Sequence, residues 1–296
     1  MEIPEEICYD IMNSVMGGGT GLDISVLQSL LYGFISGLTE FLPVSAETHR
    51  MFFTQMTGMS PEPPLLRLCV RLFALIGLFV SCHNSIMRMR REQKLSLIPA
   101  RRRRRKPDAA ILLQRRMVIS TAIPIVLGLL FTVRCAELTS LLWLQGVLLI
   151  LNGLILYLPQ FMLRGNKDAR AMSGFDSLLI GLAGALSVFS GFSRMATIVS
   201  FARMRGADKG FGVELALLLC IPALLCLCLI DFFQLISVQT SPVFLLCATA
   251  SAAAFAGSYL GVHLIRYFGR KPGFTAFAYY SWGAALLAFV LYLTII

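Results

Sequence analysis

The sequence predicts an all-α polytopic membrane protein with six transmembrane helices and two re-entrant helical hairpins in an inverted repeat. Hydrophobic residues make up 57% of the chain and charged residues only 14%, whereas soluble domains carry about a quarter charged residues. Apolar stretches long enough to cross a bilayer recur along the chain. Two shorter apolar stretches, each interrupted by polar residues, look like copies of one another.

The internal repeat has an offset of 148 residues, which is half of the 296-residue chain. Leu, Gly and Phe recur often in membrane sequences, so chance similarity is an alternative. A match at the midpoint favours an internal duplication. Without a gap, the two copies share Ser29 with Ser177, Leu30 and Leu31 with Leu178 and Leu179, Gly33 with Gly181, Phe41 with Phe189, and Ser45 with Ser193.

We predict a single integral membrane domain over residues 24–296, preceded by an N-terminal arm at 1–23 that ends in a glycine-rich segment. The first repeat covers about 24–133 and the second about 174–296. A linking span at about 140–163 is the extra crossing that lets the second repeat insert with the opposite orientation.

The first hairpin is predicted where an apolar stretch from Asp23 to Leu42 is broken at Pro43 and followed by a short stretch from Ser45 to Met56. This second arm is shorter than the roughly 20 residues that a spanning helix needs. We therefore expect it to turn back inside the membrane, with its bend covered by protein or a wet cavity.

The second hairpin is predicted from the short arms 174–189 and 194–204, which flank the sequence SGFS. Lys and Arg clusters between spans, above all at 101–106, mark cytoplasmic loops by the positive-inside rule. The net charge of +10 therefore predicts contacts with membrane lipids and no binding of nucleic acid. Full spans are predicted at 64–84, 114–133, 140–163, 211–236, 243–265 and 274–296.

Both hairpins carry polar and ionisable residues within apolar sequence, where charge is costly and usually functional. The first carries Glu40, Ser45, Glu47 and His49, and the second carries Ser190, Ser193, Arg194 and Thr197. Counting from the cytoplasmic loops, the first hairpin enters from outside and the second from inside. Inverted repeats with broken helices place a substrate site at their interface, so we expect these residues to share one pocket.

The residue types in the two hairpins suit phosphoryl transfer or hydrolysis on an amphiphilic substrate. Arg194 follows a break between two short helices, where backbone N–H groups favour an anion and a guanidinium adds bidentate phosphate binding. Glu40 and His49 supply acid–base groups and a metal ligand, and Ser45 and Ser193 supply candidate nucleophiles.

Each of these residues also has a structural interpretation. Arg194 and Glu40 also fit a buried ion pair that serves only the fold. Ser45 and Ser193 also fit helix caps, and His49 also fits an interfacial residue.

Three further charged residues lie near the ends of predicted spans. For Arg71 we weigh snorkelling of the side chain to the interface against a role in phosphate binding. For Glu214 and Asp231, solvation at a helix end is the favoured interpretation.

The motifs resemble those of the undecaprenyl-pyrophosphate phosphatases, a family also called bacitracin-resistance proteins. GLTEFLPVS at 37–45 followed by His49 looks like the family's EGLTEFLPVSSTGH, and GFSR at 191–194 looks like its PGxSRSxxT. The resemblance covers nearly the whole chain, and LTEFLPVS is a specific string.

The resemblance implies an enzyme of the bacterial plasma membrane that hydrolyses the C55 lipid diphosphate to its monophosphate and recycles the carrier of cell-wall synthesis. It also implies a divalent metal cation, Mg²⁺ or Ca²⁺. Carried over to this sequence, Glu40 serves the metal or acid–base chemistry, His49 acts as base or proton donor, and Arg194 holds the diphosphate. Ser45 and Ser193 match motif serines, and Gly191 belongs to the same substrate-binding segment.

Several positions depart from the family's pattern. The first glutamate of the acidic motif falls on Ser36, the second serine of the pair on Ala46, the proline before the glycine on Ser190, the serine after the arginine on Met195 and the final threonine on Ile198. We interpret Glu47 as a replacement for the missing carboxylate, which would hold the metal with Glu40. Thr197 is a stand-in for the lost threonine.

These departures leave the attacking group and the activity open. We prefer Ser45 or an activated water over Ser193 as the nucleophile, with His49 handling the proton. Two other functions fit the sequence: a transporter that moves a lipid phosphate without hydrolysing it, and a degenerate relative that binds polyprenyl phosphates without turnover. The sequence is compatible with a homodimer and does not fix the oligomeric state.

Overall fold

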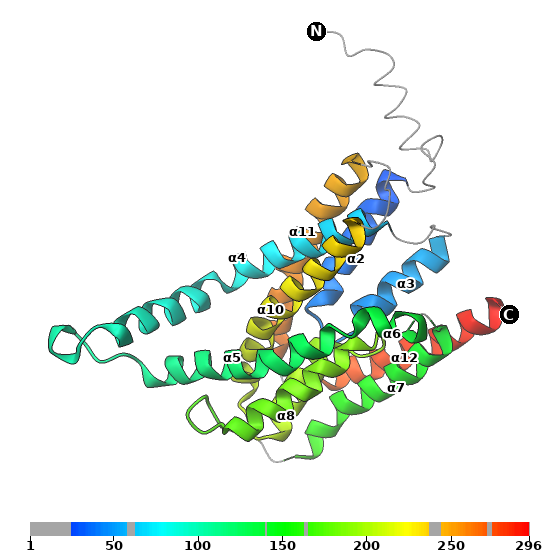
Figure 1. Cartoon of the computed structure of the whole chain (residues 1–296). Coiled ribbons are helices and arrows are strands. Elements are labelled where there is room, and N and C mark those ends of the chain that lie inside the picture. The colour runs from blue at the N-terminus through cyan, green and yellow to red at the C-terminus, as the bar shows by residue number, and fades with distance from the viewer. Residues whose placement is uncertain are drawn as a thin grey trace, which may run out of the picture.

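The computed structural model describes residues 25–57, 63–139, 141–162, 165–236, 244–270 and 274–295. The N-terminal arm predicted at 1–23 lies outside these residues. Helices dominate the described chain (Figure 1), and its β-structure is limited to one isolated bridge between Lys167 and Ala207. The predicted all-α class is therefore confirmed.

Six helices in the described part of the chain are long and apolar enough to cross a membrane. The protein is therefore a multi-pass membrane protein, and the predicted number of spans is confirmed. These helices are α4 (Pro64–Leu97), α5 (Ala109–Leu129), α7 (Leu142–Tyr157) with its extension η2 (Leu158–Phe161), α10 (Lys209–Ile236), α11 (Phe244–Gly269) and α12 (Thr275–Ile295).

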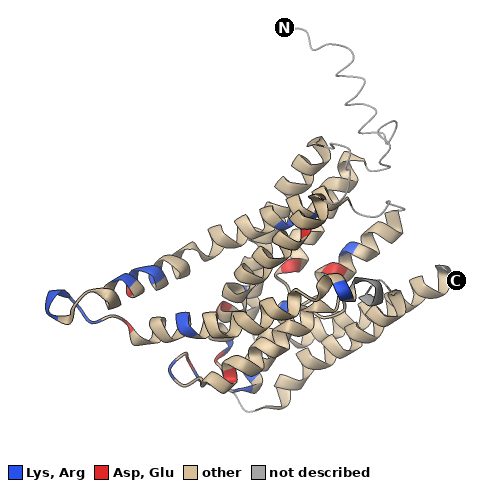
Figure 2. Ribbon diagram, in the orientation of Figure 1, with Lys and Arg blue, Asp and Glu red and all other residues tan. Residues whose placement is uncertain are grey.

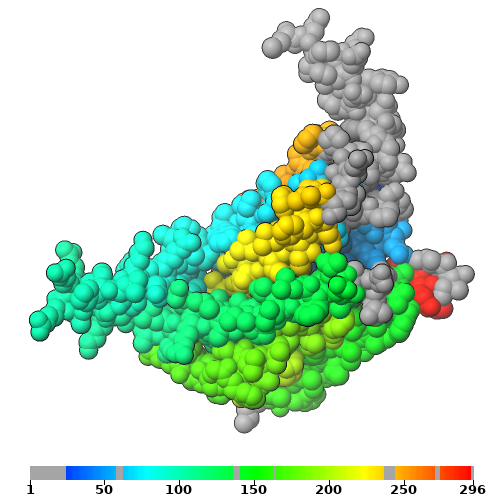
Figure 3. Space-filling view, viewed as in Figure 1, coloured from blue at the N-terminus to red at the C-terminus, as the bar shows by residue number. Residues whose placement is uncertain are grey.

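The first span is longer than its apolar sequence predicts. We expected it to end at residue 84, but α4 continues to Leu97. Its last turns are rich in Arg, Gln and Lys, which are polar but are also good helix formers, so the helix continues beyond the apolar segment. The α4–α5 hairpin stands out from the rest of the molecule (Figure 3), with Lys and Arg gathered towards its tip (Figure 2).

Four shorter helices form two consecutive pairs. The first pair is α2 (Val26–Glu40) and α3 (Ala46–Thr57), and the second is α8 (Gly174–Ala185) and α9 (Arg194–Met204). The short 3₁₀ turn η3 (Leu186–Val188) extends α8, and the helix α6 (Thr132–Thr139) fills the connector after α5. In each pair the chain is non-helical between the two helices, and the polar segment predicted from the sequence lies around this bend.

The two pairs begin in the same way. Ser25 forms a capping box with Gln28 at the start of α2, and Ser173 forms one with Asp176 at the start of α8. In each box the serine hydroxyl accepts a hydrogen bond from a backbone N–H of the first turn, which satisfies a donor that the helix leaves unpaired. Both members of the second box lie 148 residues after their counterparts in the first.

Helix α2 lies directly against the backbone of α11, and glycine allows this approach. A Cβ at Gly33 would lie 2.0 Å from the carbonyl oxygen of Ala250, and one at Gly37 would lie 2.2 Å from that of Ala254. Small residues at such contacts let two membrane helices pack at close range. The contact fixes the direction of α2 and so the place of Glu40, its last residue.

The helix pairs are packed against helices of the opposite half of the chain. The first pair contacts α11 through α2, and the second pair contacts α5 through α8. Helices α4 and α10 contact each other, while α7 packs against α12. The main core surrounds α9 and α10, where Met195, Ile198 and Leu217 are fully buried. This packing holds both bends at the centre of the molecule.

We expect Gly37→Ala to destabilise the protein, because its methyl group would meet the Ala254 backbone, which has little room to move. Overpacking of this kind costs about 1–3 kcal/mol. The thermal unfolding midpoint of the detergent-solubilised protein, followed by intrinsic fluorescence, measures the effect. Gly283→Ala is the matched control, because a Cβ at Gly283 would have no atom within 4 Å. Equal midpoints for both variants would contradict the close approach.

Candidate active site

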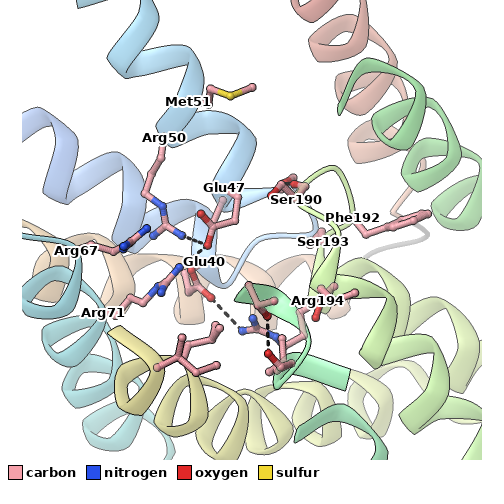
Figure 4. Close-up of a pocket in the computed structure, with 18 of the residues that line it drawn as sticks. Glu40, Glu47, Arg50, Met51, Arg67, Arg71, Ser190, Phe192, Ser193 and Arg194 are labelled. Carbon is pink, nitrogen blue, oxygen red and sulfur yellow. Dashed lines mark hydrogen bonds and ion pairs between the residues drawn. The ribbon is translucent and has the colours of Figure 1, made fainter. Parts of the chain in front are cut away.

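A cavity of about 430 Å³ lies where the bends of the two helix pairs meet (Figure 4). Charged side chains from both pairs and from α4 and α10 surround it. Among the described residues, four arginines and three carboxylates line this cavity, so its formal charge is +1 from four positive and three negative groups. They are Arg50, Arg67, Arg71, Arg194, Glu40, Glu47 and Asp231.

Hydrogen bonds join the two bends directly. The hydroxyl of Ser45 donates to the carbonyl oxygen of Ser190, and the hydroxyl of Ser193 donates to the carbonyl oxygen of Leu42 at 3.2 Å. The two bonds are equivalent, because both the donors and the acceptors are related by the offset of 148 residues. Each bend therefore satisfies a backbone carbonyl of the other at a depth where unpaired polar groups are costly.

An ion pair links the end of the first long arm to the start of the last short one. Glu40 is the last residue of α2, and Arg194 is the first residue of α9. Nη1 of Arg194 donates to Oε1 of Glu40 at 3.0 Å, and each side chain is only 8% exposed. The expectation that these two groups share one buried pocket agrees with this geometry. Because both also line the cavity, the pair remains accessible to a ligand.

A second group of charges lies beside this pair. Nη1 of Arg71 donates to both carboxylate oxygens of Asp231, at 2.7 and 2.6 Å, and its Nη2 donates to Glu47 at 2.6 Å. Arg67, one turn earlier in α4, has its Nε 3.3 Å from Asp231. Arg50 also donates to Glu47. Helices α3, α4 and α10 thus share one network of ionic hydrogen bonds.

The network corrects two interpretations of the sequence. Asp231 is 1% exposed and paired, so solvation at a helix end does not describe it. Arg71 is 6% exposed and points into the network rather than snorkelling to an interface. Both side chains are held inside because each supplies the opposite charge that the other needs.

Five of the predicted site residues line the cavity, namely Glu40, Ser45, Glu47, Ser193 and Arg194. Ser193 also caps α9, because its hydroxyl accepts from the backbone N–H of Ala196. The interpretation of Ser193 as a helix cap is therefore compatible with its position in the cavity wall.

Gly191 and Thr197 do not line the cavity. A Cβ at Gly191 would lie 2.1 Å from the Cβ of Leu148, so this glycine allows the second bend to pack on α7. Thr197 is fully buried, and its hydroxyl donates to the carbonyl oxygen of Arg194 at 3.1 Å. Their predicted role in substrate binding stays a prediction, and their contacts support the bend that carries Arg194.

His49 also points elsewhere. Its Nδ1 lies 2.6 Å from the backbone oxygen of Ser45, and its Nε2 lies 2.6 Å from the hydroxyl of Tyr280 on α12. The two rings are stacked with centroids 5.6 Å apart. These contacts tie α3 to α12, and His49 is not among the residues that line the cavity. Its predicted part in proton transfer stays a prediction.

Sequence reasoning missed Arg50 and Arg67 as residues of the site. A signal was available for Arg67, since it lies four residues before Arg71 and therefore on the same helical face, within the apolar start of a span. Arg50 follows His49 in a short polar helix and carried no comparable signal. Its pairing with Glu47 became apparent only from the fold.

The carboxylates of the cavity are a poor donor set for a divalent metal. Glu40, Glu47 and Asp231 each already accept hydrogen bonds from a guanidinium group. Within the described residues, no three His, Cys, Asp or Glu side chains converge as a metal site. Divalent cations such as Mg²⁺ need several oxygen ligands. The metal predicted at Glu40 and Glu47 stays a prediction that this arrangement does not favour.

Comparison with known proteins identifies the family of the chain. The family model for the bacitracin resistance protein BacA matches residues 29–287. The chain belongs to the BacA family. The match includes both bends and all four arginines of the cavity, so the resemblance to this family is confirmed.

Curated relatives agree with membership of the BacA family. An undecaprenyl-diphosphatase of Methanobrevibacter smithii is 28% identical over 272 residues, covering 90% of this chain and 98% of the relative. One of Halothermothrix orenii is 24% identical over 275 residues, with 90% and 98% coverage. One of a Nocardioides species is 30% identical over 204 residues, with 68% and 73% coverage.

We expect His49→Gln and Tyr280→Phe each to destabilise the protein by about 1 kcal/mol, because each removes one side of a hydrogen bond. The double variant should be less destabilised than the sum of the two, since the groups share the contact. Thermal unfolding of all three variants in detergent measures this coupling. Tyr279→Phe is a control at the neighbouring, exposed tyrosine. Strictly additive effects would contradict the contact between His49 and Tyr280.

Proposed function

We propose that this BacA-family protein hydrolyses undecaprenyl diphosphate to undecaprenyl phosphate and inorganic phosphate, recycling the cell-wall lipid carrier in the bacterial plasma membrane. One observation carries the proposal. The ion pair of Glu40 and Arg194 joins the two helix pairs inside a charged cavity within an apolar domain. A cationic cavity at the membrane suits a substrate that has an anionic head and an apolar tail.

Arg194 is the group that we assign to the diphosphate. It is the first residue of α9, so it belongs to the positive end of that helix's dipole. A helix N-terminus and a guanidinium both favour phosphate oxygens. Together they stabilise the negative charge that develops as the bond to the bridging oxygen breaks.

Glu40 is the group that we assign to the proton. Arg194 bonds only to its Oε1, and within the described residues its Oε2 accepts no hydrogen bond. A water that donates to this oxygen attacks the terminal phosphorus and passes one proton to Glu40. The bond from that phosphorus to the bridging oxygen breaks. Its electron pair stays on the lipid monophosphate, and the remaining atoms leave as inorganic phosphate.

The attacking group in this scheme is water rather than Ser45. Ser45 lines the cavity, but its hydroxyl donates its proton to the carbonyl oxygen of Ser190 and is 1% exposed. A hydroxyl in that position holds the two bends together. The scheme consequently needs no second serine at Ala46, where the family motif has one.

We also propose that the two helix pairs are re-entrant hairpins in an inverted repeat. Three matches at the same offset of 148 residues support this topology: the paired residues in the sequence, the capping boxes at Ser25 and Ser173, and the reciprocal bonds of Ser45 and Ser193. Each pair also packs against a helix of the other half, α2 against α11 and α8 against α5, and this reciprocal packing supports the repeat as well. A homodimer, with which the sequence is compatible, also remains a proposal.

The relatives support hydrolysis over transport, since those compared above are named as diphosphatases. The degenerate alternative rests on Ala46, which replaces the second motif serine, and on Ser36, which replaces the first motif glutamate and is 1% exposed. In our scheme Glu40 alone accepts the proton. A second glutamate to hold a metal is not needed, because among the described residues the arginines of the cavity outnumber its carboxylates and help to balance the charge of the diphosphate.

We expect the purified protein to release inorganic phosphate from undecaprenyl diphosphate in detergent. Arg194→Ala and Glu40→Gln should each lower kcat/KM by 100-fold or more, because each removes a group that acts on the reacting phosphoryl group. Arg205→Gln is the matched control: it also breaks a pair between an arginine and a buried carboxylate, that of Asp176, but lies outside the cavity. It should keep activity within about threefold.

The outcomes separate the alternatives. Full activity in both cavity variants would contradict the assigned roles. Binding of the lipid without release of phosphate, with release restored by Ser36→Glu together with Ala46→Ser, would identify a degenerate relative. Movement of the lipid across a vesicle bilayer without hydrolysis would identify a transporter.

A further inference from the structure

The network around Arg71 is built mainly from arginine side chains. Three arginines, Arg50, Arg67 and Arg71, share two carboxylates, those of Glu47 and Asp231. Buried ion pairs are weak sources of stability, because the loss of hydration offsets most of the attraction. Arginines that line a cavity therefore raise the question of which ligand they serve.

Arg71 has bonding capacity that its carboxylate partners do not use. Its side chain is 7% exposed and lines the cavity. Both terminal nitrogens donate to carboxylates, whereas its Nε is buried and has no hydrogen-bond partner within the described residues. A guanidinium presents its donors in one rigid plane that matches phosphate oxygens. Because the Nε has almost no accessible surface, a phosphate oxygen in the cavity would share the terminal nitrogens of Arg71 with the carboxylates.

Arg67 extends the same surface towards solvent. Its side chain is 28% exposed, and its Nη2 donates to Gln234 at 2.8 Å while its Nε faces Asp231. It lies one helical turn from Arg71 and lines the same cavity. The two arginines of α4 thus lie on one side of the cavity and Arg194 on the other, with Glu40 between them (Figure 4).

The arginines already pair with the carboxylates that a metal would need as ligands. A divalent cation would have to displace guanidinium groups from Glu47 and Asp231, and would then lie among four positive side chains that repel it. The sequence agrees with this reasoning, because Ser36 stands where the family motif has a carboxylate. The missing acidic ligand and the buried arginines both favour anion binding over metal binding.

We infer that Arg67 and Arg71, together with Arg194, neutralise the lipid diphosphate in place of a divalent cation, so that this protein hydrolyses its substrate without a bound metal. The inference rests on the proposed function. In the hydrolysis described above, Arg194 contacts the phosphoryl group beside Glu40, and Arg71 and Arg67 receive the other phosphate. No electron or proton beyond those of the attacking water is required.

The first experiment measures phosphate release by the full-length protein in detergent, with EDTA and with added Mg²⁺ or Ca²⁺. We expect the rates to agree within about threefold. A loss of tenfold or more with EDTA that either metal restores would overturn the inference and leave the proposed function intact. Absence of release under every condition would contradict the proposed function instead, and the binding experiment then decides the inference.

The second experiment measures binding of inorganic pyrophosphate to the same protein in EDTA by isothermal titration calorimetry. We expect saturable binding that weakens at least tenfold in Arg71→Lys, which keeps the charge but loses the planar set of donors. Arg67→Gln tests the same surface at a partly exposed residue, where failure to fold is not a concern, and should weaken binding by about three- to tenfold.

Arg205→Gln is the control for charge in the binding experiment and should bind as the unaltered protein does. Binding that appears only when Mg²⁺ or Ca²⁺ is added would overturn the inference. So would unchanged affinity in both Arg71→Lys and Arg67→Gln, because the diphosphate would then be held by other groups.

Discussion

The ion pair between Arg194 and Glu40 is the interaction on which the site depends. Each residue belongs to a different helix pair, and both are almost fully buried in a domain with an apolar exterior. A charge in such surroundings needs a partner, because an unpaired one carries a large desolvation penalty. Pairing therefore fixes how the two bends face each other, and the cavity lies at their junction.

Close packing of helix backbones makes this pairing geometrically feasible. The carbonyl oxygens of α11 touch Gly33 and Gly37 of α2, so the helix that ends in Glu40 has little freedom to shift. At the second bend, Gly191 packs against Leu148 of α7 in a similar way. Backbone contacts of this kind leave the bends rigid before any ligand binds. Such preorganisation is what an electrostatic site requires.

The arginines give the cavity a net positive formal charge among its described residues. A site of this charge attracts an anion more readily than a cation. Here Asp231 and Glu47 hold Arg71 inside the domain, and Arg67 adds charge at the edge. The carboxylates then act as anchors for guanidinium groups, which leaves them less able to bind a metal.

The sequence by itself determined the helical class, the number of spans and the residues Glu40, Ser45, Glu47, Ser193 and Arg194 of the cavity. Apolar length and rare buried charge are local properties, so they can be recognised without coordinates. Only the tertiary structure decided that His49 faces Tyr280 and that Asp231 pairs with Arg71. These contacts join residues far apart in the chain, and side-chain direction across such distances depends on how the helices pack.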